Sequence, residues 1–256
     1  MKHDLPGTIR DLHRRRGRER RGRTLAEGVR LVEEALASGV PVDGAVVSPA
    51  LETTPRGRAL HQALAARGVH VEPVSEREFA ALADTEHPQG VLAVVALPSW
   101  EAGDLRPSAG HPVLVLDGVQ DPGNVGTVAR TALALGVAGI VALPGTAELA
   151  NPKVVRAAMG ALFRLPAVHL EAAALPGWLR ATGAELWVAE ADGEPLGRAR
   201  AAKPVAVVVG NEGAGVHPEV AALADRRIGI PLAPGAESLN VAAAAAILLY
   251  EVTRGG

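Results

Sequence analysis

From residue 113 onward, short runs of continuously apolar residues alternate with segments of helical periodicity. A strand that is apolar on both faces has to be covered on both faces, which is typical of a mostly parallel sheet with helices on each side. The sequence therefore predicts an α/β fold for residues 113–256. Strands are predicted at 113–116, 140–143, 185–189, 205–209 and 227–230, and helices at 125–135, 152–159, 175–182 and 240–250.

Residues 1–97 also alternate helices and strands, but the pieces are shorter. Helices are predicted at 24–38, 56–66 and 75–82 and strands at 44–47, 69–71 and 91–97, with Thr24 and Glu27 at capping-box spacing. Residues 98–112 are rich in Pro, Gly and Ser and show neither period. We therefore predict a domain at 1–97, a linker at 98–112 and a second domain at 113–256.

The positive charge of the chain is concentrated at its start. Residues 1–30 hold ten basic and four acidic side chains, about +6, so the remainder carries about −8 of the total of −2. Arginine supplies nearly all of this charge, and it pairs bidentately with phosphate. The segment is either a solvated tail or a nucleic-acid contact. The candidate contacts are Arg14, Arg15, Arg16, Arg18, Arg21 and Arg23.

Composition excludes several classes of site. The chain has no cysteine, which rules out disulfides, thiolate metal sites and cysteine nucleophiles, and which fits a reducing cytoplasm. Its eight histidines show no metal-ligand spacing, so we expect no metal. No apolar run reaches the ~18 residues that a membrane helix needs. We expect a cytoplasmic protein that does not bind membranes.

Glycine-rich and polar segments follow three of the predicted strands. They are N-x-G-x-x-x-R at 124–130, GNEGAG at 210–215 and ESLN at 237–240. In open α/β sheets, the loops at the carboxyl ends of the strands build the ligand site. Arg130 is the one charged residue of an otherwise apolar helix, and a guanidinium is costly to bury without an anion. A phosphate-bearing ligand would satisfy it.

Each of these segments also has a purely structural explanation. Asn124 has the position of an N-cap, and Ser238 or Asn240 could cap the last helix. The glycine-rich loop could be only a turn. Binding of a dinucleotide is not favoured, because the glycines that follow the strand at 113–116 do not have G-x-G-x-x-G spacing.

Taken in order, the three segments resemble the sequence motifs of the SpoU/TrmH family of RNA ribose 2′-O-methyltransferases, within the SPOUT class. The matching stretches are the motif at 124–130, VVVGNEG at 207–213 and IPL…ESLNVA at 230–242. The stretch at 151–166 is also similar, although Ala158 stands where a serine is common. Residues 5–97 are similar, more loosely, to the ribosomal-protein-like RNA-binding domain of the members that modify rRNA.

The resemblance implies a trefoil knot in the second domain, S-adenosylmethionine bound in that knot without a metal, and homodimers with the RNA site at the subunit interface. The implied activity is methyl transfer to a ribose 2′-hydroxyl, with 23S rRNA favoured as the substrate. A tRNA target, and a non-catalytic RNA-binding or ribosome-assembly protein on the same fold, remain alternatives.

The resemblance also implies roles for individual residues. We expect Arg130 to hold the phosphate of the RNA and stabilise the developing alkoxide, and Asn124 and Glu212 to orient Arg130 and the ribose. Ser238 and Asn240 are expected to shape the third loop of the catalytic site. The implied cofactor contacts are Gly210, Ile230 and Leu239, with Val209, Asn211 and Pro231 beside them.

Overall fold

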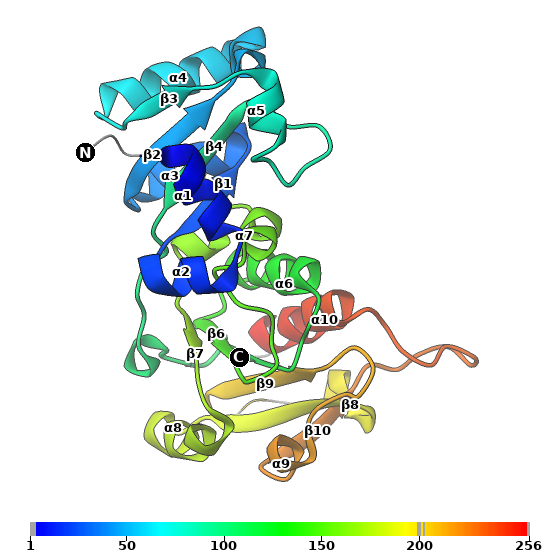
Figure 1. Cartoon of the computed structure of the whole chain (residues 1–256). Helices are drawn as coiled ribbons and strands as arrows, with labels where there is room; N and C mark the ends of the chain where they lie inside the picture. The colour runs from blue at the N-terminus through cyan, green and yellow to red at the C-terminus, as the bar shows by residue number, and fades with distance from the viewer. Residues whose placement is uncertain (1–3, 199–200, 202, 255–256) are drawn as a thin grey trace. The chain divides into compact units, whose positions relative to one another are not determined.

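The computed structural model describes residues 4–198, 201 and 203–254, and their contacts divide the chain into two compact units. The first unit is Met1–Pro98 together with Ala150–Phe163, and the second is Ser99–Leu149 together with Arg164–Gly256. Each unit has its own sheet and its own core (Figure 1). Of the basic residues counted above, Lys2 lies outside the described residues.

The first unit contains a sheet of mixed direction. β4 runs antiparallel to both β1 and β2, and β3 runs parallel to β2. Across the sheet the order is β1 (Thr24–Glu27), β4 (Val91–Val95), β2 (Val42–Val47) and β3 (Val71–Pro73).

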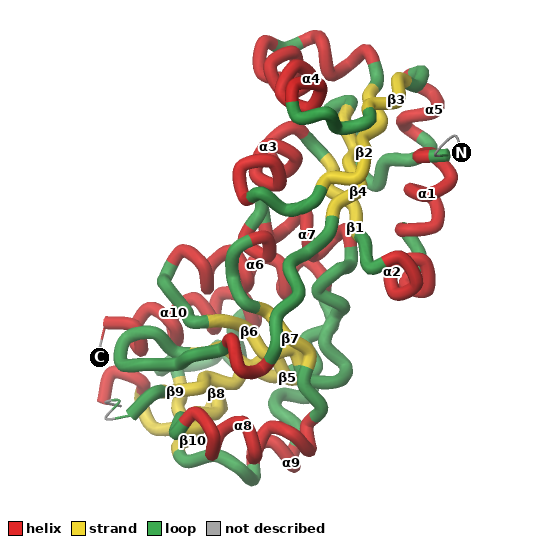
Figure 2. Tube along the Cα trace, turned by 90° about the vertical axis from the view of Figure 1, so that its left-hand side faces the viewer, coloured by secondary structure: helices red, strands yellow, loops and turns green. Residues whose placement is uncertain are grey.

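Helices cover both faces of this sheet, as Figure 2 shows. On one face, Ile9 and Phe79 share a core with Leu92 and Val94 of β4. Alternate residues of a strand point to opposite faces, and all of β4 is buried, so the strand is covered on both sides. The helices are α1 (Leu5–Leu12) and α5 (Glu76–Ala80) on the first face, α3 (Val29–Ser38) and α4 (Pro55–Ala66) on the other, and α2 (Arg15–Arg21) after α1.

The prediction of one helix over 24–38 was wrong in its first part. Thr24 pairs with Val95 and Glu27 with Leu92, so these four residues form an edge strand. α3 begins only at Val29, after Gly28 with φ 98°. The capping-box spacing is a local signal, and pairing with a strand more than sixty residues away overrides it.

The segment Ala150–Phe163 belongs to the first unit, although residues 99–149 separate it from the rest of that unit in sequence. It contains α7 (Pro152–Ala158), whose apolar side chains are buried. The Arg156 guanidinium lies 3.3 Å from the Glu27 carboxylate and 3.0 Å from that of Asp84. Apolar burial and this ion-pair group together hold the segment to the first unit.

The second unit contains a wholly parallel sheet, which confirms the predicted fold class. Every predicted strand of this unit is present, and each end agrees to within one residue except in the strand at 185–189, which extends six residues further. The short strand β7 had not been predicted. The order is β10 (Arg226–Gly229), β8 (Glu185–Pro195), β9 (Val205–Gly210), β5 (Val113–Asp117), β6 (Gly139–Ala142) and β7 (Ala167–His169).

Two layers of helices cover the parallel sheet (Figure 1). Trp178 packs on one face against Val113 and Val115, while Leu114 and Leu116 are fully buried on the other. Trp178 Nε1 also donates to the Ala102 carbonyl at 3.1 Å, so part of the predicted linker packs into this unit. The helices are α8 (Leu175–Thr182) and α9 (Pro218–Ala221) on the first face, and α6 (Pro122–Ala134) and α10 (Val241–Arg254), packed together, on the second.

Candidate active site

The loops that follow β5, β9 and β10 all leave the parallel sheet at its carboxyl edge. β5 and β9 are neighbours and end in register, with Asp117 paired to Gly210. β5 is followed in the sheet by β6 and β7 on one side, and β9 lies on its other side. The order of strands therefore reverses between β5 and β9, and such switch points are where open α/β sheets bind ligands.

Glu212 links the second sequence motif to the first. Its carboxylate accepts hydrogen bonds from the backbone amides of Gln120 and Asp121, each at 3.2 Å. The side-chain amide of Asn124 donates to the same carboxylate at 3.1 Å. One carboxylate therefore fixes both the turn before α6 and the side chain of Asn124.

Asn124 is not the N-cap of α6. Asp121 has that role, because its carboxylate accepts from the Asn124 backbone amide at 2.7 Å and Pro122 takes the first helical position. The helix therefore begins three residues earlier than the sequence predicts. Since the Asn124 side chain is not used for capping, it is available for contacts across the site.

Asn240 links the third motif to the other two. Its side-chain oxygen accepts from the Ala242 amide at 2.9 Å, so Asn240 caps α10, one of the two roles considered for it from the sequence. Its side-chain amide also donates to the Asn124 oxygen at 3.1 Å. Glu212, Asn124 and Asn240 thus form a continuous hydrogen-bonded chain through all three motifs.

This chain fixes the ionisation of Glu212. Partial burial raises the pKa of the carboxyl, but hydrogen bonds from the Asn124 side chain and from nearby backbone amides lower it by more. The net result is a pKa below the ordinary value of 4.5. Near neutral pH, Glu212 is therefore an anion that accepts hydrogen bonds and has no proton to donate.

Asn211 holds the glycine-rich loop in place. Its side-chain amide donates to the Gly118 carbonyl at 2.9 Å, and its oxygen accepts from the amides of Gly213 and Ala214, both at 2.9 Å. A Cβ at Gly210 would lie 2.2 Å from the Gly215 carbonyl carbon. Only glycine fits at this position, so the loop is a specific structure and more than a flexible turn.

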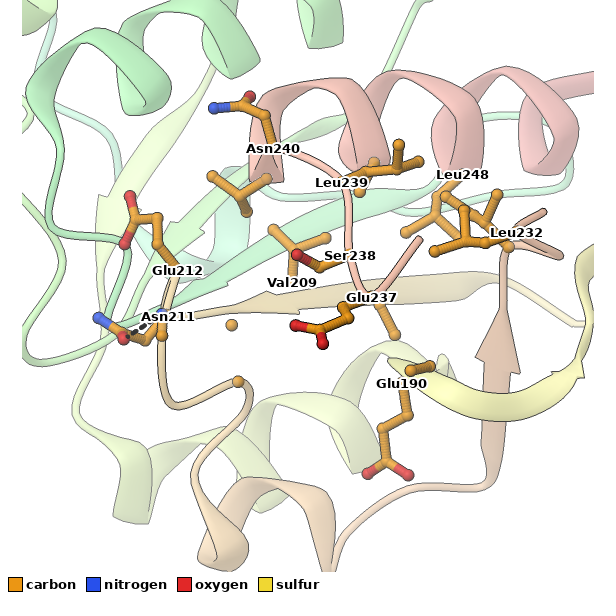
Figure 3. A pocket seen from close by; sticks show the side chains of 18 of the residues that line it. Glu190, Val209, Asn211, Glu212, Leu232, Glu237, Ser238, Leu239, Asn240 and Leu248 are labelled. Atoms are coloured by element: carbon orange, nitrogen blue, oxygen red, sulfur yellow. Dashed lines mark hydrogen bonds between the residues drawn. The ribbon is translucent and has the colours of Figure 1, made fainter. Parts of the chain in front are cut away.

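A pocket of about 460 Å³ opens beside this loop (Figure 3). Five of the six predicted cofactor residues line it: Val209, Gly210, Asn211, Ile230 and Leu239. The predicted catalytic residues Glu212, Ser238 and Asn240 line it as well. Pro231, the sixth predicted cofactor residue, is exposed and does not line the pocket.

The pocket also contains residues that were given no role from the sequence. Leu232 and Leu248 form an apolar wall, and Glu190 and Glu237 add two carboxylates. Ala189–Ala191 come from β8, which extends to Pro195, beyond its predicted end. These residues lie at the end of a predicted strand, as the three motifs do, and this position could have identified them from the sequence.

Arg130 lies apart from the pocket lining. It is exposed on α6, about 9 Å of helical rise beyond Asn124. Within the part of the chain that the structure describes, it has no hydrogen-bond or ion-pair partner. The expected orientation of Arg130 by Asn124 and Glu212 is therefore not seen within one chain.

The N-terminal arginines are mostly engaged in ordered contacts. Arg18 is only 5% exposed and donates to the carbonyls of Leu12 at 2.9 Å and His13 at 3.1 Å. We therefore assign Arg18 to holding α2 on α1. Arg15, Arg21 and Arg23 pair with Glu19, Asp11 and Asp43, respectively.

Arg14 and Arg16 are exposed, and none of the contacts among the described residues pairs them with an acid. Their guanidinium groups remain available for a phosphate. Among the same residues, no group of His, Asp or Glu side chains is arranged to hold a metal ion. None of the described helices combines the length and apolarity needed to cross a membrane.

Comparison with known proteins matches two parts of the chain to family models. Residues 111–250 match the model of the SpoU rRNA Methylase family. Residues 8–93 match the MRM3-like substrate binding domain. The chain is 36% identical to the 23S rRNA (guanosine(2553)-2'-O)-methyltransferase RlmP of Bacillus subtilis (strain 168), over 94% of this chain and 92% of that protein.

Several solved structures resemble nearly the whole chain, two of them with AdoMet bound. The first is an AdoMet-bound rRNA methyltransferase from Sinorhizobium meliloti, with a TM-score of 0.87, 31% identity, and coverage of 99% of this chain and 95% of that one. The second is the SpoU methyltransferase AviRb from Streptomyces viridochromogenes in complex with AdoMet. Its TM-score is 0.85 at 29% identity, and the match covers 99% of this chain and 98% of that one.

Proposed function

We propose that this chain, which belongs to the SpoU rRNA methylase family, transfers a methyl group from S-adenosylmethionine to a ribose 2′-hydroxyl of 23S rRNA. The observation that carries this proposal is the hydrogen-bonded chain from Glu212 through Asn124 to Asn240 at the mouth of one pocket. It unites all three motifs of an enzyme site, although they are separated by up to 116 residues of sequence.

The pocket fits S-adenosylmethionine. Its volume of about 460 Å³ lies within the range of pockets for small ligands. Gly210 lines the pocket without a side chain, and Leu232 and Leu248 provide an apolar surface for a base. When bound, the cofactor supplies a methyl group already activated on a sulfonium, so the chemistry needs no metal.

The protein's task is then to align the ribose oxygen and stabilise the charge that develops on it. Asn124 is held from both sides, by Glu212 and Asn240, so its position is fixed before the RNA binds. Arg130 has no hydrogen-bond or ion-pair partner among the described residues, so its guanidinium is available for the phosphate beside the reacting ribose. A guanidinium offers hydrogen-bond donors and no acceptor, which favours charge stabilisation over proton abstraction.

The first unit supplies RNA affinity in this proposal. The match to a substrate binding domain and the available guanidinium groups of Arg14 and Arg16 support that role. Since Arg18 is buried, we leave it out of the proposed contacts. A cytoplasmic location, where ribosomes are assembled and used, is part of the same proposal.

We propose further that the protein acts as a homodimer and that its C-terminal segment forms a trefoil knot, as the sequence resemblance implies. Ile247 and Tyr250 support the dimer, because they are 41% and 45% exposed and lie one turn apart on α10. α10 packs against α6, which carries Arg130. A second copy on this face would bring its own residues to Arg130, which lies outside the pocket of its own chain.

The test is a transfer assay with tritium-labelled S-adenosylmethionine on a panel of naked 23S rRNA, large ribosomal subunits and bulk tRNA. We expect label in rRNA or in the subunits, located on ribose after nuclease digestion. Label confined to tRNA would favour the tRNA alternative. An absence of label from every RNA would favour a non-catalytic RNA-binding protein.

A further inference from the structure

The three carboxylates that line the pocket have different environments. Glu190 accepts from the Arg227 guanidinium. Glu212 accepts from Asn124 and from two backbone amides. Glu237 has no hydrogen-bond or ion-pair partner anywhere in the described ranges 4–198, 201 and 203–254. Of the three, Glu237 therefore has all its acceptor positions open to a ligand.

The direction of the side chains agrees with this difference. In Figure 3, the Glu237 carboxylate points into the middle of the pocket. The Glu190 side chain points away from the middle, toward the lower part of the same view. Glu237 is thus the carboxylate that a bound molecule would meet.

The pocket has two chemically distinct ends, and Glu237 lies between them. Leu232 and Leu248 form an apolar end. Glu212 and Asn240 form a polar end, which continues into Asn124. A ligand that extends across the pocket therefore has its central portion beside Glu237.

The proposed cofactor has a matching order of groups. Its adenine is a flat, largely apolar ring suited to the leucine end, and its methyl group has to lie near Asn124 and Asn240 to reach the RNA. The ribose connects the adenine to the sulfonium, so it occupies the middle. Its two neighbouring hydroxyls are donors that a carboxylate can accept together.

We infer that Glu237 binds the 2′- and 3′-hydroxyls of the cofactor's ribose, and so positions the adenosine half of S-adenosylmethionine. The inference rests on the proposed function. Carboxylates recognise ribose in the same way in dinucleotide-binding folds, where an acid accepts from the 2′-hydroxyl. Here the acid comes from the loop before the last helix.

Binding calorimetry on the full-length protein tests this role. Wild type, Glu237→Ala and Glu237→Gln are each titrated with S-adenosylmethionine, with S-adenosylhomocysteine and with the 2′-deoxy and 3′-deoxy analogues of S-adenosylhomocysteine. Glu219→Gln, an exposed acid on α9 outside the pocket, is the matched control. Circular dichroism and thermal unfolding check that each variant folds.

We expect Glu237→Ala to bind both S-adenosylmethionine and S-adenosylhomocysteine about 10- to 100-fold more weakly, since hydrogen bonds to a charged group are strong. Removal of a ribose hydroxyl should weaken binding to wild type but have little further effect on Glu237→Ala, because the two changes remove one interaction. Glu219→Gln should bind like wild type.

Two results would overturn the inference while leaving the proposed function intact. In the first, the deoxy analogues lose as much affinity for Glu237→Ala as for wild type, so the hydroxyls are bound elsewhere. In the second, Glu237→Ala loses affinity for S-adenosylmethionine alone, so the carboxylate serves the sulfonium charge. A wild-type protein that binds none of these ligands would contradict the proposed function itself.

Discussion

The side-chain amide of Asn240 donates a hydrogen bond to the side-chain oxygen of Asn124 at 3.1 Å, although 116 residues separate them in sequence. The other side of Asn124 donates to Glu212 at 3.1 Å, so its amide group is used in both directions. A side chain with both ends engaged is held in one orientation. The three sequence motifs therefore act as one hydrogen-bonded group.

If this group acts as a unit, the effects of its substitutions are not additive. Asn124→Ala and Asn240→Ala should each lower kcat by about 10- to 100-fold, because small displacements of positioning groups are costly. The double variant should be little worse than the poorer single one. Steady-state kinetics on the four proteins measures this, and effects that multiply would show that the two asparagines act independently.

Arg130→Ala should lower kcat by ~10²–10³, as the loss of one group that stabilises the transition state does. Affinity for S-adenosylmethionine should remain near that of wild type, because Arg130 does not line the pocket. Calorimetry and a transfer assay together separate the two effects. Arg180→Ala, an exposed arginine on α8, is the control, and lost cofactor binding in Arg130→Ala would contradict this division of roles.

The lowered pKa of Glu212 makes a pH-dependent contribution to stability. Because the pKa is lower in the folded than in the unfolded chain, the carboxylate stabilises the fold above the ordinary value of 4.5. That contribution is lost as the pH falls through the folded-state pKa. The free energies of unfolding of wild type and Glu212→Gln, measured in urea, should therefore differ by a constant amount near neutral pH and converge below pH 4.5. A difference that grows on acidification would show the opposite sign of shift.

The RNA contact assigned to the first unit predicts a change in salt dependence. Arg14→Ala and Arg16→Ala should each weaken RNA binding and reduce the slope of log K against log salt by roughly one unit. Arg77→Ala, an exposed arginine on α5 of the same unit, should leave that slope unchanged. Filter binding at several salt concentrations measures it, and equal slopes for all the variants would remove α2 from the interface.

Point variants are preferable to deletion of residues 1–97 in this experiment. Deletion would expose Val154, Val155, Leu162 and Phe163, which are at most 4% exposed in the first unit. Loss of RNA binding after deletion would then not be separable from loss of the fold.

The exposed apolar positions of α10 predict the oligomeric state. Ile247→Lys places a charge on the proposed dimer face and should shift the protein toward monomer in sedimentation velocity. Glu219→Lys, on α9, should leave the mass unchanged. A monomeric wild-type protein at micromolar concentration would contradict the dimer.

Much of the second unit could be predicted from the sequence, because its strands are apolar on both faces and its ligand loops follow them directly. The start of α6 could not be placed from Asn124 alone, since Asp121 and Pro122 together form an equally good helix start three residues earlier.

What sequence reasoning missed depends on distant contacts. Thr24–Glu27 is a strand only because β4 pairs with it, and Ala150–Phe163 joins the first unit through Arg156 and buried apolar residues. Glu237 lies in the ESLN segment but could not be given a role from the sequence. Its role depends on the fact that Glu190 and Glu212 have hydrogen-bond partners, whereas Glu237 has none among the described residues.

The proposed methyl transfer is tested in the cell by a transcriptome-wide map of ribose 2′-O-methylation with and without the gene. We predict that one methylated ribose in 23S rRNA is lost without the gene, restored by wild type and not restored by Arg130→Ala. Identical maps with and without the gene would contradict the proposed function, and full restoration by Arg130→Ala would contradict the role of Arg130.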